Sequence, residues 1–246
     1  MNALLSVWTW FEIGLVAFLG WLLQLALAPV TWPFDRRRLV LGRTFRLVGV
    51  LASHLTPFWH FRVVGPTPKV AGRTVVVSNH ESQADPFLIS HLPWEMKWLG
   101  KASLFRIPVV GWMMWLAGDI PVHRGDKASG KGAMAHCARW LARGVPVMIF
   151  PEGTRSTDAG LLPFKDGAFR LAIETGADIL PIAVWGTRSA LPKYSWRFQK
   201  AYASVTVGTP LPTRGLTLES LEALKGAARL QVEGLRERLR SLAAAQ

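Results

Sequence analysis

The chain has 246 residues, half of them hydrophobic, which is enough to bury a core in one α/β domain with an appendage. A mean hydropathy of +0.22 is too mixed for a multi-span transporter. The 29 basic residues exceed the 16 acidic ones by 13, which favours polyanionic partners such as nucleic acid, anionic lipid headgroups or phosphorylated substrates. The single cysteine, Cys137, excludes an internal disulfide and a cysteine cluster for zinc. Its place in a helix-like run predicts a small buried residue rather than a catalytic thiol.

An apolar run near the start of the chain, Gly14–Val30, is close to the lower length limit for spanning a bilayer. No Lys or Arg precedes Arg36, whereas eight basic residues and no acidic one lie between Arg36 and Arg73. The positive-inside rule therefore places the residues after the run in the cytoplasm. Basic residues beside an anionic leaflet also hold a protein there by about 1 kcal/mol each. A cleaved signal peptide is the rival interpretation, because Ala26-Leu27-Ala28 resembles a cleavage site, but the basic n-region is missing and Pro29 follows directly.

A second apolar segment, Leu47–Phe61, predicts an interfacial helix packed against the first. The resulting hairpin would either span the bilayer or dip into one leaflet, and the sequence leaves both open. We assign residues 1–62 to N-terminal membrane-associated helices and residues 63–246 to an α/β catalytic domain.

Apolar strand-like runs alternate with helical stretches over the rest of the chain. The expected strands are Thr74–Ser78, Ile120–His123, Val145–Phe150, Ile179–Val184 and Ala203–Val207. One helix is expected to begin at Pro86, and two others are expected over Ala133–Arg143 and Thr217–Leu242. This alternation predicts an α/β fold with a mixed, largely parallel sheet flanked by helices, preceded by the apolar helical hairpin that anchors it to a membrane.

His80 and Asp85 are the first candidates for chemistry. On one helix they would lie about 140° apart and could not touch. Asp85 precedes Pro86, however, so we expect Asp85 at the helix N-cap and His80 in the loop before it. A tight loop can bring the carboxylate to one ring nitrogen and leave the other free to accept a proton. Alternatively, Asp85 only caps the helix and His80 only lines a loop.

The run Phe150–Ser156 places Arg155 just past an expected strand, where α/β sheets bind ligands. Gly153 lets the backbone approach closely, and Arg155 offers a planar fork to phosphate. Arg124 follows another expected strand, and together with Lys101 the two arginines would form a phosphate clamp. The alternative is an ordinary turn with a solvated arginine.

Two motifs are absent from the sequence. There is no Gly-x-Ser-x-Gly elbow to support a serine acyl-enzyme, and no Gly-x-x-x-x-Gly-Lys loop to support a nucleotide kinase. The remaining histidines (54, 60, 91, 123 and 136) show no metal-ligand spacing, so we expect no metal and assign them to packing or surface.

Four blocks in this order resemble the glycerolipid acyltransferase superfamily, and most of all its bacterial 1-acyl-glycerol-3-phosphate acyltransferases. The blocks are His80-x-x-x-x-Asp85, Gly118–Arg124, Phe150–Arg155 and Leu180–Ile182. The likeness covers about residues 63–210, and its first and third blocks are the most specific.

The resemblance implies transfer of a fatty acyl group from acyl-CoA or acyl carrier protein, with no other cofactor. The acceptor would be the sn-2 hydroxyl of lysophosphatidic acid and the product phosphatidic acid. His80 would deprotonate the hydroxyl and Asp85 would orient His80, with direct attack on the thioester and no covalent enzyme intermediate. The residues implied to hold the acceptor's glycerol phosphate are Arg124, Glu152, Gly153, Thr154 and Arg155. Lys101 would either bind phosphate as well or support the oxyanion site.

The sequence departs from the family where Pro121 and His123 replace the common Phe and Asp, which leaves room for another lysolipid such as lyso-ornithine lipid. From another class, a lipid or thioester hydrolase would use the same pair on water. A nucleic-acid binder would need exposed stacking aromatics on a basic face, whereas many tryptophans here lie in apolar runs typical of a membrane interface. We therefore expect an anionic bilayer and its lipids as partners and no nucleic acid, with the catalytic domain on the cytoplasmic face of the cytoplasmic membrane.

Overall fold

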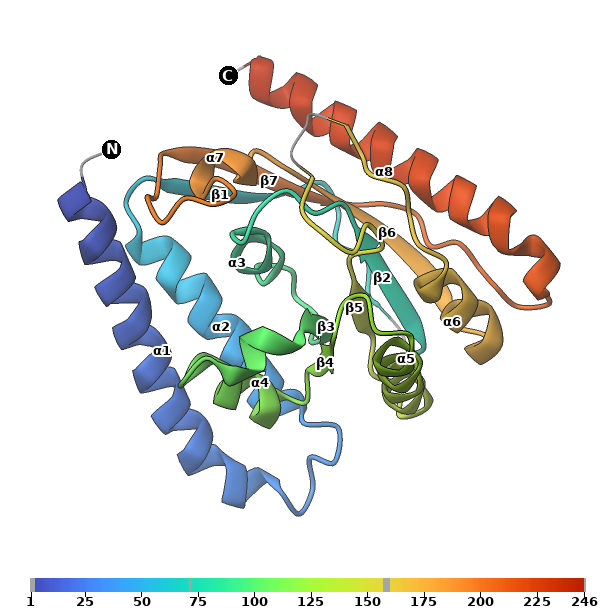
Figure 1. Ribbon diagram of the computed structural model, residues 1–246, viewed down its shortest axis with the longest axis horizontal. Helices are drawn as coiled ribbons and strands as arrows, with labels where there is room; N and C mark the ends of the chain where they lie inside the picture. The colour runs from blue at the N-terminus through green and yellow to red at the C-terminus, as the bar shows by residue number, and fades with distance from the viewer. Residues whose placement is uncertain (1–2, 71, 157–159, 246) are drawn as a thin grey trace.

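The computed structural model describes residues 3–70, 72–156 and 160–245, and within them a seven-stranded sheet is flanked by helices (Figure 1). The strands are β1 (Trp59–Val64), β2 (Thr74–Ser78), β3 (Lys97–Lys101), β4 (Ile120–Val122), β5 (Val147–Ile149), β6 (Asp178–Trp185) and β7 (Ala201–Val207). The helices are α1 (Ala3–Thr31), α2 (Leu39–Leu55), α3 (Asp85–Ile89), α4 (Val110–Ala117), α5 (Lys127–Ala142), α6 (Gly167–Thr175), α7 (Thr187–Ala190) and α8 (Leu221–Ala244). Short 3-10 helices cover Ala102–Arg106 and Leu218–Ser220.

The strand order is β1-β7-β6-β2-β5-β3-β4. Five neighbouring strands, β6, β2, β5, β3 and β4, run parallel, whereas β7 is antiparallel to β6 and carries β1 parallel to itself. The predicted mixed, largely parallel sheet is therefore confirmed. Its consequence for function is that five strands end at the same edge, where α/β sheets bind their ligands.

Strand β2 illustrates why the apolar runs of this sequence form central strands. Successive side chains point to opposite faces, so Val75 and Val77 pack with α5, α6 and α8, while Val76 packs with α3 on the other face. All three valines are fully buried. A strand covered on both sides needs a continuous apolar run, and β2 and β6 were predicted for that reason.

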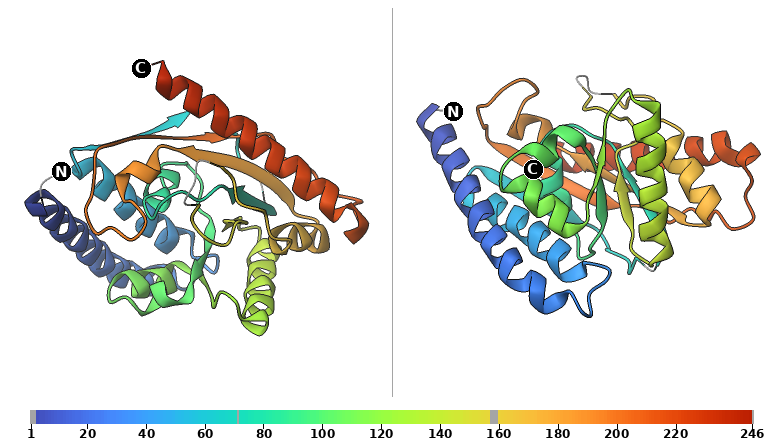
Figure 2. Two further views of the ribbon diagram at one scale, coloured as in Figure 1. Left: turned by 45° about the horizontal axis from the view of Figure 1, so that its top comes forward. Right: turned by 60° about the horizontal axis from the view of Figure 1, so that its bottom comes forward.

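The N-terminal helices form the predicted hairpin, and α1 runs alongside α2 and α4 (Figures 1 and 2). Gly20 of α1 meets Val48 of α2, and Gln24 Nε2 donates to the Leu41 carbonyl at 2.7 Å. The apolar helix is longer than the run that predicted it, because it begins at Ala3 and includes Glu12.

The prediction of a single helix over Leu47–Phe61 was wrong. The helix ends at Leu55, and Trp59 begins β1, which pairs with the distant strand β7. In β1 the aromatic side chains Trp59 and Phe61 face the interior and their neighbours face outward, which is strand rather than helix periodicity. The domain boundary expected between residues 62 and 63 falls inside this strand.

Helix α5 begins six residues before the predicted Ala133, because the Asp126 side chain accepts hydrogen bonds from the N–H groups of Ala128 and Ser129 at 2.9 and 3.1 Å. This N-cap compensates for two glycines in the first turns, which weakened the helical pattern of the sequence. The sequence patterns also gave no indication of β1, β3, α4, α6 or α7.

A buried ionic cluster joins α2 to the sheet. Arg46 Nη2 lies 2.5 Å from Asp119 Oδ1, and Lys97 Nζ lies 3.0 Å from Glu95 Oε1 and donates to the Arg38 carbonyl at 2.8 Å. Breaking a buried pair by removing one partner typically costs about 3–5 kcal/mol, because a charge is left uncompensated. From the sequence we expected the basic residues between Arg36 and Arg73 to face lipid headgroups. Arg46 is an exception, because its side chain faces inward.

Candidate active site

The His80 and Asp85 side chains meet at the end of β2. His80 Nδ1 lies 2.6 Å from Asp85 Oδ2, Asp85 is fully buried, and the His80 ring is 11% exposed. Since a carboxylate accepts hydrogen bonds, this contact favours the proton on Nδ1 and leaves Nε2 as an acceptor. The predicted juxtaposition is therefore present, in a form suited to accepting a proton from a ligand.

Asp85 holds this loop instead of capping the helix. The predicted N-cap position was wrong, because Ala84 occupies it and Asp85 is the first residue of α3. Asp85 Oδ2 also accepts hydrogen bonds from the N–H groups of Glu81 and Ser82, at 2.7 and 3.0 Å. The carboxylate thus fixes both the loop backbone and the histidine ring.

The second oxygen of Asp85 is held by a residue that the sequence analysis missed. The Thr187 hydroxyl donates to Asp85 Oδ1, and Thr187 is fully buried at the start of α7. It follows Gly186, whose φ of 91° and close approach to the Tyr202 carbonyl both favour glycine. The signal available in the sequence was that Gly186 and Thr187 directly follow an expected strand.

Glu152 connects the two loops that carry the sequence motifs. It is buried, and its Oε1 accepts the His80 N–H at 2.8 Å while its Oε2 accepts the Leu162 N–H at 3.1 Å. Burial raises the pKa of Glu152, and these two hydrogen bonds oppose the rise. The Phe150 ring stacks on His80 with centroids 4.0 Å apart. The Phe150–Ser156 loop therefore holds His80 through both its backbone N–H and its ring.

Basic side chains gather at the ends of three adjacent strands. Lys101 ends β3, Arg124 follows β4 and Arg155 follows β5. Partial burial lowers the pKa of Arg124, and the positive charge of Arg155 lowers it further, so the two guanidinium groups are close enough to repel each other. Such a pair is stabilised by a bound anion, and phosphate suits the planar fork of each arginine.

The remaining residues of this loop form its outer part. Thr154 is exposed, and Gly153 has a φ of 71°, a left-handed conformation that favours glycine. A Cβ at Gly153 would lie 2.7 Å from Lys165 Nζ. Lys165 is thus a further basic residue at the site that the sequence analysis did not identify.

Two arginines missed by the sequence analysis also reach the site from distant parts of the chain. Arg236 of α8 donates from Nε to Glu81 Oε1 at 3.1 Å, and Arg188 of α7 donates to Ser156 Oγ at 3.0 Å. Burial raises the pKa of Glu81 to about 7, nearby Asp85 adds to the rise, and the two arginines oppose it. No local pattern in the sequence announces the contact between Glu81 and Arg236.

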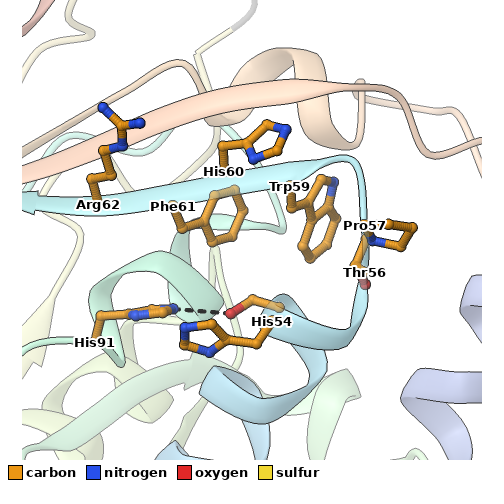
Figure 3. Close-up of a pocket in the computed structure, with 9 residues that line it drawn as sticks. His54, Thr56, Pro57, Trp59, His60, Phe61, Arg62 and His91 are labelled. Atoms are coloured by element: carbon orange, nitrogen blue, oxygen red, sulfur yellow. Dashed lines mark hydrogen bonds between the residues drawn. The ribbon is translucent and has the colours of Figure 1, made fainter.

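A cavity of about 350 Å³ lies apart from these motif residues, between the end of α2, β1 and His91 (Figure 3). His54 and His91 lie on one side of β1 and His60 on the other. Burial and the neighbouring His54 lower the pKa of His91 to about 4, and Ser53 Oγ lies 2.9 Å from its Nε2. His91 is partly buried, whereas His54 and His60 are exposed.

Neither a reactive thiol nor a metal site is found among the described residues. Cys137 is buried in α5, and burial raises the pKa of its thiol to about 12, so it is not a nucleophile at neutral pH. Within the described residues no group of three His, Cys, Asp or Glu side chains is arranged to hold a metal ion.

Comparison with known proteins identifies a consistent set of relatives. A family model described as Acyltransferase matches residues 60–185. A 1-acyl-sn-glycerol-3-phosphate acyltransferase of Chlamydomonas reinhardtii is 34% identical over 192 residues, which are 74% of this chain but only 58% of that protein, so the chain spans less than two thirds of its length. The 1-acyl-sn-glycerol-3-phosphate acyltransferase alpha of Homo sapiens is 31% identical over 85% of this chain and 75% of its own. The crystal structure of the 1-acyl-sn-glycerophosphate (LPA) acyltransferase PlsC from Thermotoga maritima is similar with a TM-score of 0.75, at 26% identity over 95% of both chains.

Proposed function

The chain belongs to the acyltransferase family, and on that premise we propose that it acylates the sn-2 hydroxyl of lysophosphatidic acid to give phosphatidic acid. The names of its relatives support this acceptor. The observation that carries the proposal is the 2.6 Å contact between His80 and Asp85 at the sheet edge where Arg124 and Arg155 follow β4 and β5. The part of this edge at His80 suits a hydroxyl, and the part at the two arginines suits a phosphate.

In the proposed reaction, His80 Nε2 accepts the proton of the sn-2 hydroxyl as the oxygen attacks the thioester carbonyl of acyl-CoA or acyl carrier protein. The carbon–sulfur bond then breaks, and the leaving thiolate accepts the proton that His80 took from the hydroxyl. General-base assistance of this kind contributes roughly 10²–10⁴ in rate. The acyl group passes directly to the acceptor, so no acyl-enzyme forms.

The phosphate of the acceptor is held by Arg124 and Arg155, with Lys101 at the end of β3, the strand between β4 and β5. Two neighbouring guanidinium groups repel one another when the site is empty, and a phosphate dianion removes that repulsion. Glu152 acts through His80 and through the loop it supports, because both of its oxygens accept main-chain hydrogen bonds.

The α1–α2 hairpin associates with a membrane in this proposal. Among the described residues, α1 is the helix long and apolar enough to cross a bilayer. One side of α1 packs on the protein along its length, from Ser6 to Gln24. Its other side exposes large apolar side chains, among them Leu4, Trp8, Phe11, Leu15, Leu19 and Leu22. A crossing would carry the polar groups packed beside α1 into hydrocarbon, so we favour a hairpin that dips into one leaflet, on the cytoplasmic side.

The acceptor is tested with detergent-solubilised protein and an acyl-CoA or acyl carrier protein donor. Lysophosphatidic acid and lyso-ornithine lipid are offered in parallel, and acylated lipid and free thiol are measured. Phosphatidic acid supports the proposal, and product from lyso-ornithine lipid alone would move the acceptor. Free thiol without acylated lipid would mean hydrolysis and would overturn the proposal.

The phosphate site has its own test. Arg155→Gln removes one charge-assisted contact, worth about 1.5–3 kcal/mol, so KM for lysophosphatidic acid is expected to rise roughly tenfold or more while kcat changes less. An unchanged KM would remove Arg155 from the site.

A further inference from the structure

The segment between α7 and β7, with the first residues of that strand (residues 192–202), presents aromatic and basic side chains together. Tyr194 is 91% exposed, Trp196 48% and Tyr202 56%. Each of these rings has a cation beside it: Lys193 lies 5.5 Å from the Tyr194 ring, Arg197 5.6 Å from Trp196 and Lys200 5.0 Å from Tyr202. No acidic residue occurs between positions 178 and 219. Aromatic rings with adjoining cations are typical of the layer of a bilayer that contains the headgroups.

This segment is joined to the first turns of α1. Trp10 Nε1 donates to the Trp196 carbonyl at 2.8 Å, and the Phe198 N–H donates to Ser6 Oγ at 3.2 Å. The rings of Trp10 and Phe198 are 4.8 Å apart. Figures 1 and 2 place the loop before β7 beside the N-terminal end of α1. The loop that carries Tyr194 and Trp196 therefore adjoins the exposed first turns of α1. Tyr202 instead stacks on His60, on the opposite face of β1 and β7 from the hairpin.

The same segment is also tied to the candidate active site. Ser82 Oγ donates to the Leu191 carbonyl at 3.0 Å, one residue before the segment begins. Lys193 Nζ donates to the Arg155 carbonyl at 3.3 Å. Both contacts are to loops that hold His80 and the anion site. A surface that binds the segment is thereby brought close to the site.

We infer that the first part of this segment, residues 192–198, forms a second membrane-docking surface, which binds the headgroup layer of an anionic bilayer beside α1 and sets the active site at that level. The inference extends the membrane association proposed for the hairpin to a distant part of the chain, and it does not depend on the acyl-transfer chemistry. An acidic protein would match the positive charges. It would not account for exposed aromatic rings beside the exposed apolar first turns of α1, and that proximity selects lipid as the occupant.

The first experiment places a fluorophore on the segment. Cys137 is buried and its thiol pKa is about 12, so Tyr194→Cys provides one reactive thiol in the native protein. An environment-sensitive dye at this position is expected to shift to the blue in phosphatidylglycerol–phosphatidylcholine vesicles and to be quenched by spin-labelled lipid. The same dye on Glu174→Cys, an exposed position on α6, is expected to stay in water.

A dye at position 194 that stays in water, while the protein floats with the vesicles, would overturn the inference. A shift at position 194 on adding acyl carrier protein, with none on adding vesicles, would overturn it in favour of an acidic protein partner. Neither readout requires activity, so a failure of this inference is distinguishable from a failure of the proposed reaction.

The second experiment tests the charge with matched variants. Arg197→Glu and Arg238→Glu change the net charge equally, but Arg238 is an exposed residue of α8, on the opposite face of the sheet from the α1–α2 hairpin (Figure 1). Since each basic residue near an anionic surface contributes about a factor of five, reversing Arg197 is expected to weaken vesicle affinity about tenfold to thirtyfold, and reversing Arg238 to change it little. Equal losses would attribute the attraction to net charge and would refute a local docking surface.

Discussion

Replacing Thr187 by valine removes the hydroxyl that donates to Asp85 Oδ1 and keeps the shape of the side chain. A hydrogen bond to a charged group is worth about 1.5–3 kcal/mol, and Thr187 is fully buried, so water does not replace the lost donor. If Asp85 must be held in place to orient His80, the lost hydrogen-bond energy raises the activation free energy of acyl transfer. At about 1.4 kcal/mol per factor of ten, kcat should fall roughly 10- to 150-fold.

The assay measures kcat and KM for lysophosphatidic acid with detergent-solubilised protein, at a temperature where thermal unfolding shows both variants folded. KM should change little, because Thr187 lies beneath Asp85 and does not reach the substrate. Thr187→Ser is the matched control, since it keeps the hydroxyl and loses only a methyl group. Wild-type kcat in Thr187→Val, or equal impairment of the two variants, would refute the reasoning.

Two further predictions concern stability, measured by thermal unfolding in detergent. The pKa of Glu81 is raised to about 7, so the folded protein binds an extra proton between about pH 4.5 and 7 and loses up to about 3 kcal/mol of stability as pH rises through that window. Glu81→Gln should therefore gain stability relative to wild type from pH 5 to pH 8, and parallel pH profiles would contradict this. Gly42→Ala should cost about 1–3 kcal/mol, because its Cβ would collide with Glu95, which the buried contact with Lys97 holds in place. Gly130→Ala, in a helix with open space around it, should be neutral or stabilising, and equal effects of the two alanines would argue against close packing at Gly42.

What the sequence predicted correctly depended on local signals. Pro86 indicated the start of α3 to within one residue and so placed His80 in the loop before it, and the continuous apolar run of β2 indicated a strand buried on both faces. What it missed depended on contacts between distant residues. The Oδ1 oxygen of Asp85 accepts a hydrogen bond from Thr187, 102 positions away, and Glu81 pairs with Arg236, 155 positions away.

The errors had the same origin. Trp59 and Phe61 continue an apolar segment, and only their partner strand β7 makes that part extended. Arg46 stands in a basic block, and its partners in the interior are the distant carboxylates of Glu95 and Asp119, the latter 73 positions later. Composition cannot separate an arginine that faces lipid headgroups from one that a buried carboxylate neutralises.

The most direct test of the account compares turnover of lysophosphatidic acid by the wild-type protein and by His80→Ala, with binding of the acceptor measured in both. The account predicts that the variant still folds and binds the acceptor through its arginines, while phosphatidic acid formation falls by roughly 10²–10⁴. Turnover close to wild type in His80→Ala would show that another group accepts the proton, and would contradict the central claim.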